Sequence, residues 1–549
     1  MNYREFEKYS ALEKSLEKQR PDNLVDIWSK VSSYTDPDRC AYYTLSDKSQ
    51  KYNAEDFALF SSFASSAADA TANGLSVGLS NSSEEWMRLA ASEASLNEKI
   101  NVNRFFHNST QRQLFVMGKS NIYDILKNTY RDMATIGSGA FYLQQDPEMV
   151  LFSHHLMPGS YYIATNHLNK ITQFYRPVTM TAYQIYSYWG PREDYPTNLK
   201  KALGMTTSKP SWDTEFLVKH LVIPNDDYIP GSKFGLTKKY AEIYYLSGGG
   251  SETNVNNYIF EKKGRSYFPV IFGPWEREGN LPWGVRSPGS KCLGNFGSLA
   301  EMNKGGFKYL DRSMDPLLQS QAEIKDIEKI GRLKHAITNR DDIMSPVYQP
   351  TIDVNFLLQS KAEIKQEIER VFYVDVFRQF TNMDRRNITA REIAERNAEK
   401  MAQITSIVQS VQVNVHDPTI FAFFTEMFER GMFEEPPEEL EGAEYRVDYL
   451  GELAMTQRAF NNNNIISYLE LQPLIDNTTS SMVIKEQMNL DLAKGFNINP
   501  NAIRSIEEAK QIDAQKQEMQ NELMRQQAEL QQAQTQKTQA ETLNIEQAS

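Results

Sequence analysis

The sequence is poor in cysteine: its 549 residues include only Cys40 and Cys292. Two cysteines form one disulfide at most, which excludes the disulfide framework of small secreted domains and fits a reducing compartment. The sequence also lacks a run of about 18 apolar residues, the length that spans a bilayer as a helix. Its first 20 residues are charged throughout, without the apolar segment of a signal peptide. We therefore expect neither secretion nor a membrane partner.

An excess of basic residues is also missing. Lys and Arg total 59 against 71 Asp and Glu, for a formal net charge of -12. Tight binding of nucleic acid needs clustered basic side chains, because these release counterions from the phosphates. The charge balance therefore argues against such binding. It does not exclude DNA that moves past the protein, because firm phosphate contacts would oppose sliding.

Complete catalytic and cofactor motifs are absent. Gly118-Lys119-Ser120 looks like the end of a phosphate-binding loop, but Gln113 stands where that loop requires its first glycine. The glycine pair at 137 and 139 lacks the third glycine of a dinucleotide fingerprint, and we interpret Gly137 as a helix end. We predict no cofactor and no enzymatic activity.

The two candidate metal-binding pairs are weak. His154 and His155 are adjacent, so on a strand they point to opposite faces and cannot readily share a metal ion. Asp226 and Asp227 lie between two prolines, in a segment typical of a turn rather than of a two-metal nuclease. We therefore predict no metal site.

What the sequence does contain suffices for a large folded structure. Its 40% hydrophobic and 11% aromatic content permits a sizeable core, and its length predicts two or more structural regions. The pattern is mostly helical up to about residue 145, where Ser82 and Glu85 predict a capping box that opens a helix through Trp86. Short aromatic and β-branched runs over about 141–275 predict a mixed β region. Beyond about residue 300 the pattern is mainly helical again.

An apolar stripe at helical spacing follows on an otherwise charged segment. Its members are Ile364, Ile368, Val371, Phe372 and Phe380. The stripe packs either inside its own subunit or against another subunit. The polar turn TNMDRRN comes next, and a capping box of Thr389 and Glu392 predicts a second long helix. The last 45 or so residues carry a fading heptad seam, typical of a helix that associates with other copies or frays.

Six segments spread over most of the chain resemble, in the same order, the portal proteins of short-tailed bacteriophages. They are ATANGLSVGLSNSSEEWMRL, FYRPVTMTAYQI, YFPVIFGPWEREGNLPWGVRSPG, SLAEMNKGGFKYLDRSMDPLLQ, ITAREIAERNAEK and EYRVDYLGELAMTQRA. The resemblance implies an α+β portal fold, mainly helical, with a mixed β wing, stem helices, a clip and a helical crown or barrel. Gly305 and Gly306 depart from the family by interrupting the first expected stem helix.

The resemblance also implies how the chain is divided. The divisions are the wing 1–290, with its β-rich part 141–275; the first stem helix 291–314; the clip 315–354; the second stem helix 355–380; the tunnel loop 381–388; a long wing helix 389–435; the crown 436–505; and a C-terminal helical barrel or frayed tail 506–549. In this division Ile364, Ile368, Val371 and Phe372 belong to the second stem helix.

The implied function is a dodecameric ring at one capsid vertex of the virion, assembled in the host cytoplasm. DNA would be packaged and ejected through the ring. Its partners would be further copies of itself, double-stranded DNA read without sequence specificity, the terminase motor, the tail adaptor and the major capsid protein.

The tunnel loop is implied to line the channel through Asn382, Arg385, Arg386 and Asn387. We hypothesise that the two arginines project toward DNA, because a closed ring repeats each charge around its axis. Alternatively, they pair with Asp384 or with a glutamate of a neighbouring subunit, and the sequence leaves both arrangements open.

Two other functions compete with this prediction. A packaging ATPase or nuclease would require a complete phosphate-binding loop or a carboxylate cluster, and the sequence contains neither. A non-conducting internal or scaffolding protein of the virion would also be acidic and helical. A ring with a central hole distinguishes a portal from that alternative.

Overall fold

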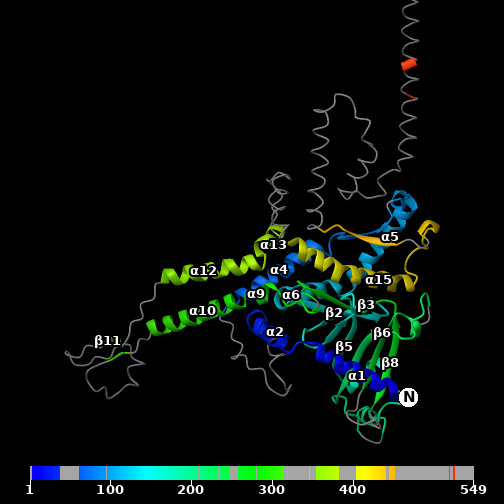
Figure 1. Cartoon of the computed structure of the whole chain (residues 1–549), viewed down its shortest axis with the longest axis horizontal. Helices are drawn as coiled ribbons and strands as arrows, with labels where there is room; N and C mark the ends of the chain where they lie inside the picture. The colour runs from blue at the N-terminus through cyan, green and yellow to red at the C-terminus, as the bar shows by residue number, and fades with distance from the viewer. Residues whose placement is uncertain are drawn as a thin grey trace, which may run out of the picture. The chain divides into compact units, whose positions relative to one another are not determined.

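The computed structural model describes residues 3–37, 61–93, 95–206, 209–232, 235–246, 257–277, 279, 281–314, 318–319, 345–346, 354–381, 404–440, 444–451, 519 and 524–525. The chain forms two compact units: the larger combines Met1–Glu84 with Phe115–Met432, and the smaller combines Glu85–Leu114 with Phe433–Ser549. Helices and strands are mixed in the described residues (Figure 1), which confirms the predicted α+β class. Among these residues no helix is both long and apolar enough to span a membrane.

A five-stranded antiparallel sheet forms one wall of the larger unit. Its strands, in spatial order, are β4 (Tyr162–Thr165), β5 (Ile171–Thr181), β6 (Glu215–Pro224), β7 (Tyr240–Leu246) and β8 (Tyr258–Arg265). Side chains alternate between the two faces of a strand, so Leu221, Ile243 and Tyr245 share one face. Helix α1 (Tyr3–Gln19) covers that face with Tyr9 and Leu16.

A three-stranded sheet packs against the other face of this wall. Its spatial order is β3 (Val150–Leu156), β2 (Ser138–Asp146) and β9 (Val270–Pro274), and both pairings are antiparallel. The core between the sheets is rich in aromatic residues: the rings of Trp28, on α2 (Asp22–Thr35), and Tyr161 each lie 5.5 Å from that of Trp283. The strands of both sheets lie where the aromatic and β-branched runs predicted them.

Helices surround the two sheets and extend away from them. Those of the larger unit include α4 (Phe63–Leu79), α6 (Ile122–Ile136), α7 (Ala182–Trp189), α8 (Thr197–Ala202), α9 (Pro288–Lys291), α10 (Leu293–Met314), α12 (Val354–Val371), α13 (Val374–Thr381) and α15 (Asp417–Glu429), with the 3-10 turn η3 (Gly235–Thr237) and the π-helical turn η4 (Gln412–His416). Helix α6 ends at Gly137, whose φ is 94°, as the sequence predicted. Helix α10 runs through Gly305 and Gly306, so the interruption expected there is wrong.

The smaller unit contains a two-stranded antiparallel sheet of β1 (Met87–Ala91) and β12 (Tyr445–Tyr449). It also includes η2 (Leu96–Glu98), η5 (Glu438–Leu440) and the part of α5 (Ile100–Lys119) up to Leu114. The predicted helix through Trp86 is therefore wrong. The ring of Trp86 stacks on Tyr449 at 6.5 Å, and Glu85 accepts a hydrogen bond from Arg88 at 3.0 Å. Pairing with a strand far along the chain has overridden the local helix signal.

Several predicted segments lie wholly or largely outside the described residues. Within the predicted clip 315–354, the structure describes β10 (Leu318–Gln319), which pairs with β11 (Ser345–Pro346), and the first residue of α12. The tunnel loop beyond Thr381, the capping box at Thr389, and most of the crown and C-terminal tail lie outside the described residues. The family divisions of these segments therefore stay predictions.

Candidate functional site

The candidate site comprises three helices of the larger unit, the pair α10 and α12 and the short helix α13, with the contacts that hold them against the rest of that unit (Figure 1). Of the predicted site residues, Ile368 and Phe372 are fully buried and Ile364 and Val371 are half-buried. Ile368 and Phe372 therefore pack within their own chain. Another four, Asn382, Arg385, Arg386 and Asn387, lie outside the described residues.

The predicted single helix over 355–380 is wrong at its centre. Helix α12 ends at Val371, Tyr373 adopts a left-handed φ of 56°, and α13 begins at Val374. Phe372 and Phe377, on either side of this break, are both buried. The break changes the direction of the chain, so that both rings reach the core. The helix is therefore interrupted although the apolar spacing of the sequence is regular.

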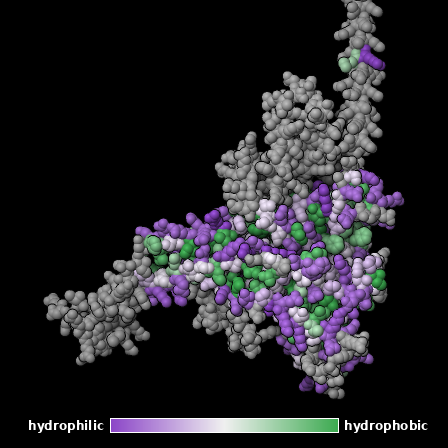
Figure 2. Space-filling view, viewed as in Figure 1, coloured by the Kyte–Doolittle hydropathy of each residue, from purple (hydrophilic) through white to green (hydrophobic). Residues whose placement is uncertain are grey.

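The ends of α10 and α12 that lie away from the sheets carry exposed apolar side chains. On α10 these are Phe307, Leu310 and Met314, and on α12 they are Val354, Phe356 and Leu358, all at least half exposed. The α10 residues recur at i, i+3 and i+7, so they form one face. Figure 2 shows green patches among purple ones over this helix pair. Exposed apolar clusters of this kind mark protein interfaces.

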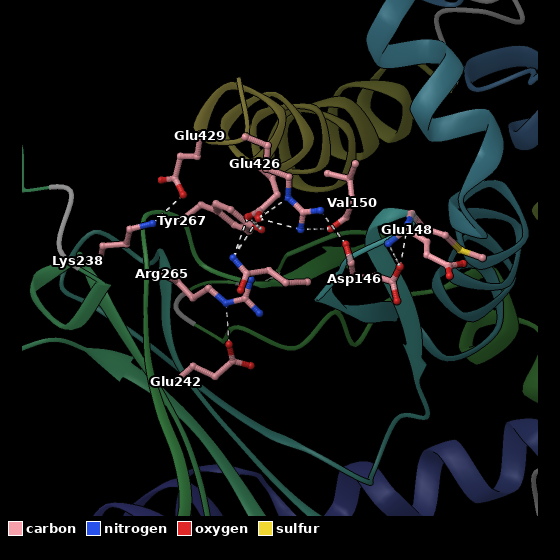
Figure 3. A network of polar contacts seen from close by, with 12 residues as sticks. Asp146, Glu148, Val150, Lys238, Glu242, Arg265, Tyr267, Glu426 and Glu429 are labelled. Carbon is pink, nitrogen blue, oxygen red and sulfur yellow. Dashed lines mark hydrogen bonds and ion pairs between the residues drawn. The ribbon is translucent and has the colours of Figure 1, made fainter. Parts of the chain in front are cut away.

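On the opposite side of the unit, α15 is fastened to the sheets by two carboxylates and an arginine (Figure 3). Glu426 accepts hydrogen bonds from Gln145 at 3.0 Å and from Tyr267 at 3.3 Å. Arg430 donates to Glu426 at 3.2 Å and to the carbonyl oxygens of Asp146 and Val150 at 2.8 and 3.1 Å. We call these residues, together with Glu429, the α15 latch.

Glu429 adds a second attachment one turn along the helix. It accepts hydrogen bonds from Lys238 at 2.7 Å and from Ser266 at 2.6 Å. Burial alone would raise the pKa of Glu429, but these donors outweigh it and hold the pKa below its usual value. Glu429 therefore keeps its charge at neutral pH, and the latch joins α15 to both β2 and the β8 end of the larger sheet.

Beneath the latch lies a fully buried charge cluster, which we call the Glu242 cluster. Glu242 accepts hydrogen bonds from Arg265 at 2.6 Å, from Tyr142, and from His220 at 3.0 Å. Arg176 Nε lies 3.1 Å from His220 Nδ1, so it donates to that nitrogen, and the imidazole carries its proton on Nε2.

The charges of the cluster follow from these contacts. Burial favours a neutral Glu242, but the guanidinium of Arg265 and the hydrogen bond from His220 outweigh it and hold the pKa of Glu242 far below its usual value. Burial lowers the pKa of His220 to about 4, so this histidine is neutral at pH 7. The cluster is therefore a buried ion pair of Glu242 and Arg265 with a neutral histidine beside it.

Perturbed pKa values often mark catalytic residues, but the Glu242 cluster has a structural arrangement. The carboxylate is shared among three protein donors, and the described residues contain no group of three His, Cys, Asp or Glu side chains that could hold a metal ion. His154 and His155 bond separately, to Gln144 and to Asp132, each at 2.8 Å, as expected for opposite faces of a strand.

No pattern in the sequence predicted the α15 latch. The available signal was a carboxylate on an apolar helix face: Glu426 follows the buried Phe423 by three residues and precedes the buried Met427. A charged residue on a buried helix face requires a partner. The sequence could have shown that Glu426 needed one, but not that Gln145 and Tyr267 supply it.

Comparison with known proteins identifies the family. The model of the family described as bacteriophage head to tail connecting protein matches residues 7–493. The chain belongs to this family. It is 24% identical over 453 residues to the probable portal protein of Bordetella phage BPP-1, covering 81% of this chain and 78% of that protein. It is also 24% identical over 392 residues to the portal protein of Salmonella phage epsilon15, covering 70% and 68%.

Family membership confirms the resemblance to portal proteins of podoviruses. A head-to-tail connecting protein has a structural role in the phage particle and is not an enzyme, as the family description and the names of both relatives indicate. The exposed apolar ends of α10 and α12 are the main surface feature of the candidate site.

Proposed function

We propose that this head-to-tail connecting protein forms a dodecameric ring at one capsid vertex, through which DNA is packaged and ejected. The terminase motor and later the tail adaptor dock on the clip, and the major capsid protein surrounds the wing. The observation that carries this proposal is the family match over residues 7–493. The exposed apolar side chains at the ends of α10 and α12 support it, because exposed apolar clusters are typical of protein interfaces.

Ring closure explains how an acidic chain conducts DNA. In a closed head-to-tail ring each residue recurs around the axis once per subunit, so one position on the chain becomes a belt of charge or of apolar surface. The local charge at the channel then matters more than the net charge of -12.

The first test is electron microscopy of the purified chain, with the rotational symmetry of class averages counted. We expect rings with a central hole wide enough for duplex DNA. Rings of the double variant Phe307→Ser/Phe356→Ser are expected to dissociate into subunits at protein concentrations roughly 10-fold to 100-fold higher than rings of the unsubstituted chain. This change corresponds to a loss of about 1.4–2.8 kcal/mol for the two side chains together, as expected if each is only partly buried at an interface.

Leu168→Ser is the matched control, because Leu168 is as exposed as Phe307 but lies on the turn between β4 and β5. Its rings should form at the unchanged concentration. Monomers or rods from the unsubstituted chain would contradict the ring and favour the non-conducting structural role.

The predicted tunnel loop gives a second test. In Arg385→Ala/Arg386→Ala, we expect rings to form normally while the fraction of particles that retain full-length DNA falls severalfold, because two cations per subunit are removed from the channel. Arg378→Ala is the control, since Arg378 on α13 already pairs with Glu369 at 3.1 Å. Normal DNA retention with weakened rings would instead support pairing of the loop arginines with carboxylates.

A further inference from the structure

Helix α4 consists largely of small residues, and this needs a physical reason. Its sequence is FASSAADATANGLSVGL, and its buried residues include Ala67, Thr71 and Gly74. A glycine inside a helix destabilises it by about 1 kcal/mol relative to alanine, because the unfolded chain gains conformational freedom. Gly74 therefore indicates that another part of the chain comes unusually close.

That part is α13. A Cβ atom at position 74 would lie well inside van der Waals contact with Cβ and Cγ of Phe377, whose side chain is almost fully buried. Only glycine at this position lets Phe377 sit against the backbone of α4. The notch at Gly74 thus fixes one side chain of the helix that follows the break.

The break itself creates an unpaired carbonyl group. In a continuous helix the N–H of Val376 would bond to Phe372 O, but it bonds instead to Tyr373 O, at 3.0 Å. Phe372 O is thereby released in a buried environment, where an unsatisfied carbonyl is costly.

Thr71 satisfies this carbonyl. Its Oγ1 lies 2.7 Å from Phe372 O, which is closer than the 3.0 Å to Ala67 O in its own helix, so the hydroxyl donates to the carbonyl released by the break. Thr71 precedes Gly74 by three residues and therefore lies on the same face of α4. The two residues hold the two sides of the break: Phe372 before Tyr373 and Phe377 after it.

We propose that Thr71 and Gly74 of α4 are positioning residues that set the break at Tyr373 and so direct α13 and the predicted tunnel loop that follows it. The left-handed φ of 56° at Tyr373 is unfavourable for a residue with a side chain, and the two α4 contacts offset this cost. The role in the channel rests on the proposed function, whereas the positioning of α13 does not.

The experiment uses the full chain assembled as rings, with Cys40 and Cys292 replaced by alanine. Spin labels are placed at Gln366→Cys on α12 and Asp375→Cys on α13, both exposed, and labelled chains are diluted with unlabelled ones. The distance between the labels reports the angle across the break and requires no DNA. DNA retention in particles is measured separately, without the labels.

Thr71→Val removes the hydroxyl at nearly constant shape, and Thr71→Ser keeps it. We expect Thr71→Val to broaden the single label distance and to reduce DNA retention severalfold, and Thr71→Ser to match the unsubstituted chain in both. Gly74→Ala, which pushes Phe377 out of its notch, should shift the same distance. Thr71→Val thus tests the contact before the break, at Phe372, and Gly74→Ala tests the contact after it, at Phe377.

An unchanged label distance in both Thr71→Val and Gly74→Ala would overturn the proposal. A changed distance with normal DNA retention would support the positioning of α13 by α4 and overturn its role in the channel. If rings of the unsubstituted chain failed to hold DNA, the proposed function would be wrong, while the label distances would still decide whether α4 sets the break.

Discussion

Arg265→Met is expected to lower the free energy of unfolding of the larger unit by about 3–5 kcal/mol, because removing one partner of a buried ion pair leaves the other charge uncompensated. Arg265 Nε donates to Glu242 at 2.6 Å, and both side chains are almost completely buried. His220 and Tyr142 still donate to the carboxylate, but neither of them carries a positive charge at neutral pH. The measurement is the midpoint of urea unfolding, followed by tryptophan fluorescence.

Lys263→Met on the same strand is the matched control. Lys263 pairs with Glu261 at 2.6 Å near the surface, where such pairs contribute about 0–1 kcal/mol, so its midpoint should change little. In Arg265→Met/Glu242→Leu neither charge remains, and part of the lost stability should return. Equal midpoints for Arg265→Met and Lys263→Met would show that Glu242 is not held as a buried charge.

Acidification is expected to destabilise the larger unit well before its carboxylates are protonated. Burial lowers the pKa of His220 to about 4 and that of His416 to about 3, whereas an unfolded histidine has a pKa of 6.5. Between these values the unfolded chain binds a proton that the folded chain does not, so stability falls as the pH falls below 6.5. At pH 5 each fully buried histidine costs about 2 kcal/mol.

Glu242 acts in the same direction but at lower pH. Its pKa is held far below the usual 4.5, so its contribution is present above pH 4.5 and is lost as the pH falls further. A loss of stability between pH 6.5 and 5 is therefore caused by proton binding to the histidines of the unfolded chain and not by protonation of Glu242.

The test compares urea midpoints at pH 7.5 and pH 5. His416→Gln should reduce the loss between these two pH values by about 2 kcal/mol. The Tyr130 hydroxyl and His416 Nε2 share a hydrogen bond of 2.7 Å. Because His416→Gln changes this bond, the variant should also be less stable at pH 7.5. His167→Gln, at an exposed position, should leave the pH dependence unchanged. A pH dependence equal in all three proteins would contradict charging of His416 as the cause.

Local signals explain the parts of the fold that were predicted correctly. The end of α6 at Gly137 was predictable because the residue that ends a helix often has a left-handed backbone conformation, which favours glycine. A side chain at this position would also collide with the carbonyl oxygen of Gly284. The strands over 141–275 were predictable because short runs of aromatic and β-branched residues favour strands, and turn-forming residues separate the runs.

Predictions failed where distant segments compete with a local pattern. Ser82 and Glu85 form a regular capping-box pattern, yet Trp86 leads into a strand because β12 supplies its hydrogen-bonding partner. The stripe around Phe372 is regular through Phe380, yet it divides at Tyr373 because α4 offers a hydroxyl and a notch at that point.

The same distinction applies to the candidate site. The sequence by itself determined the α+β class, the absence of complete catalytic motifs, and the order of segments that places the chain among head-to-tail connecting proteins. Only the tertiary structure decided that the chain breaks between α12 and α13, that Glu426 fastens α15, and that Glu242 stays charged inside the protein. The periodicity of a segment is set by residues a few positions apart, whereas a backbone break and a buried charge are stabilised by partners that only folding brings together.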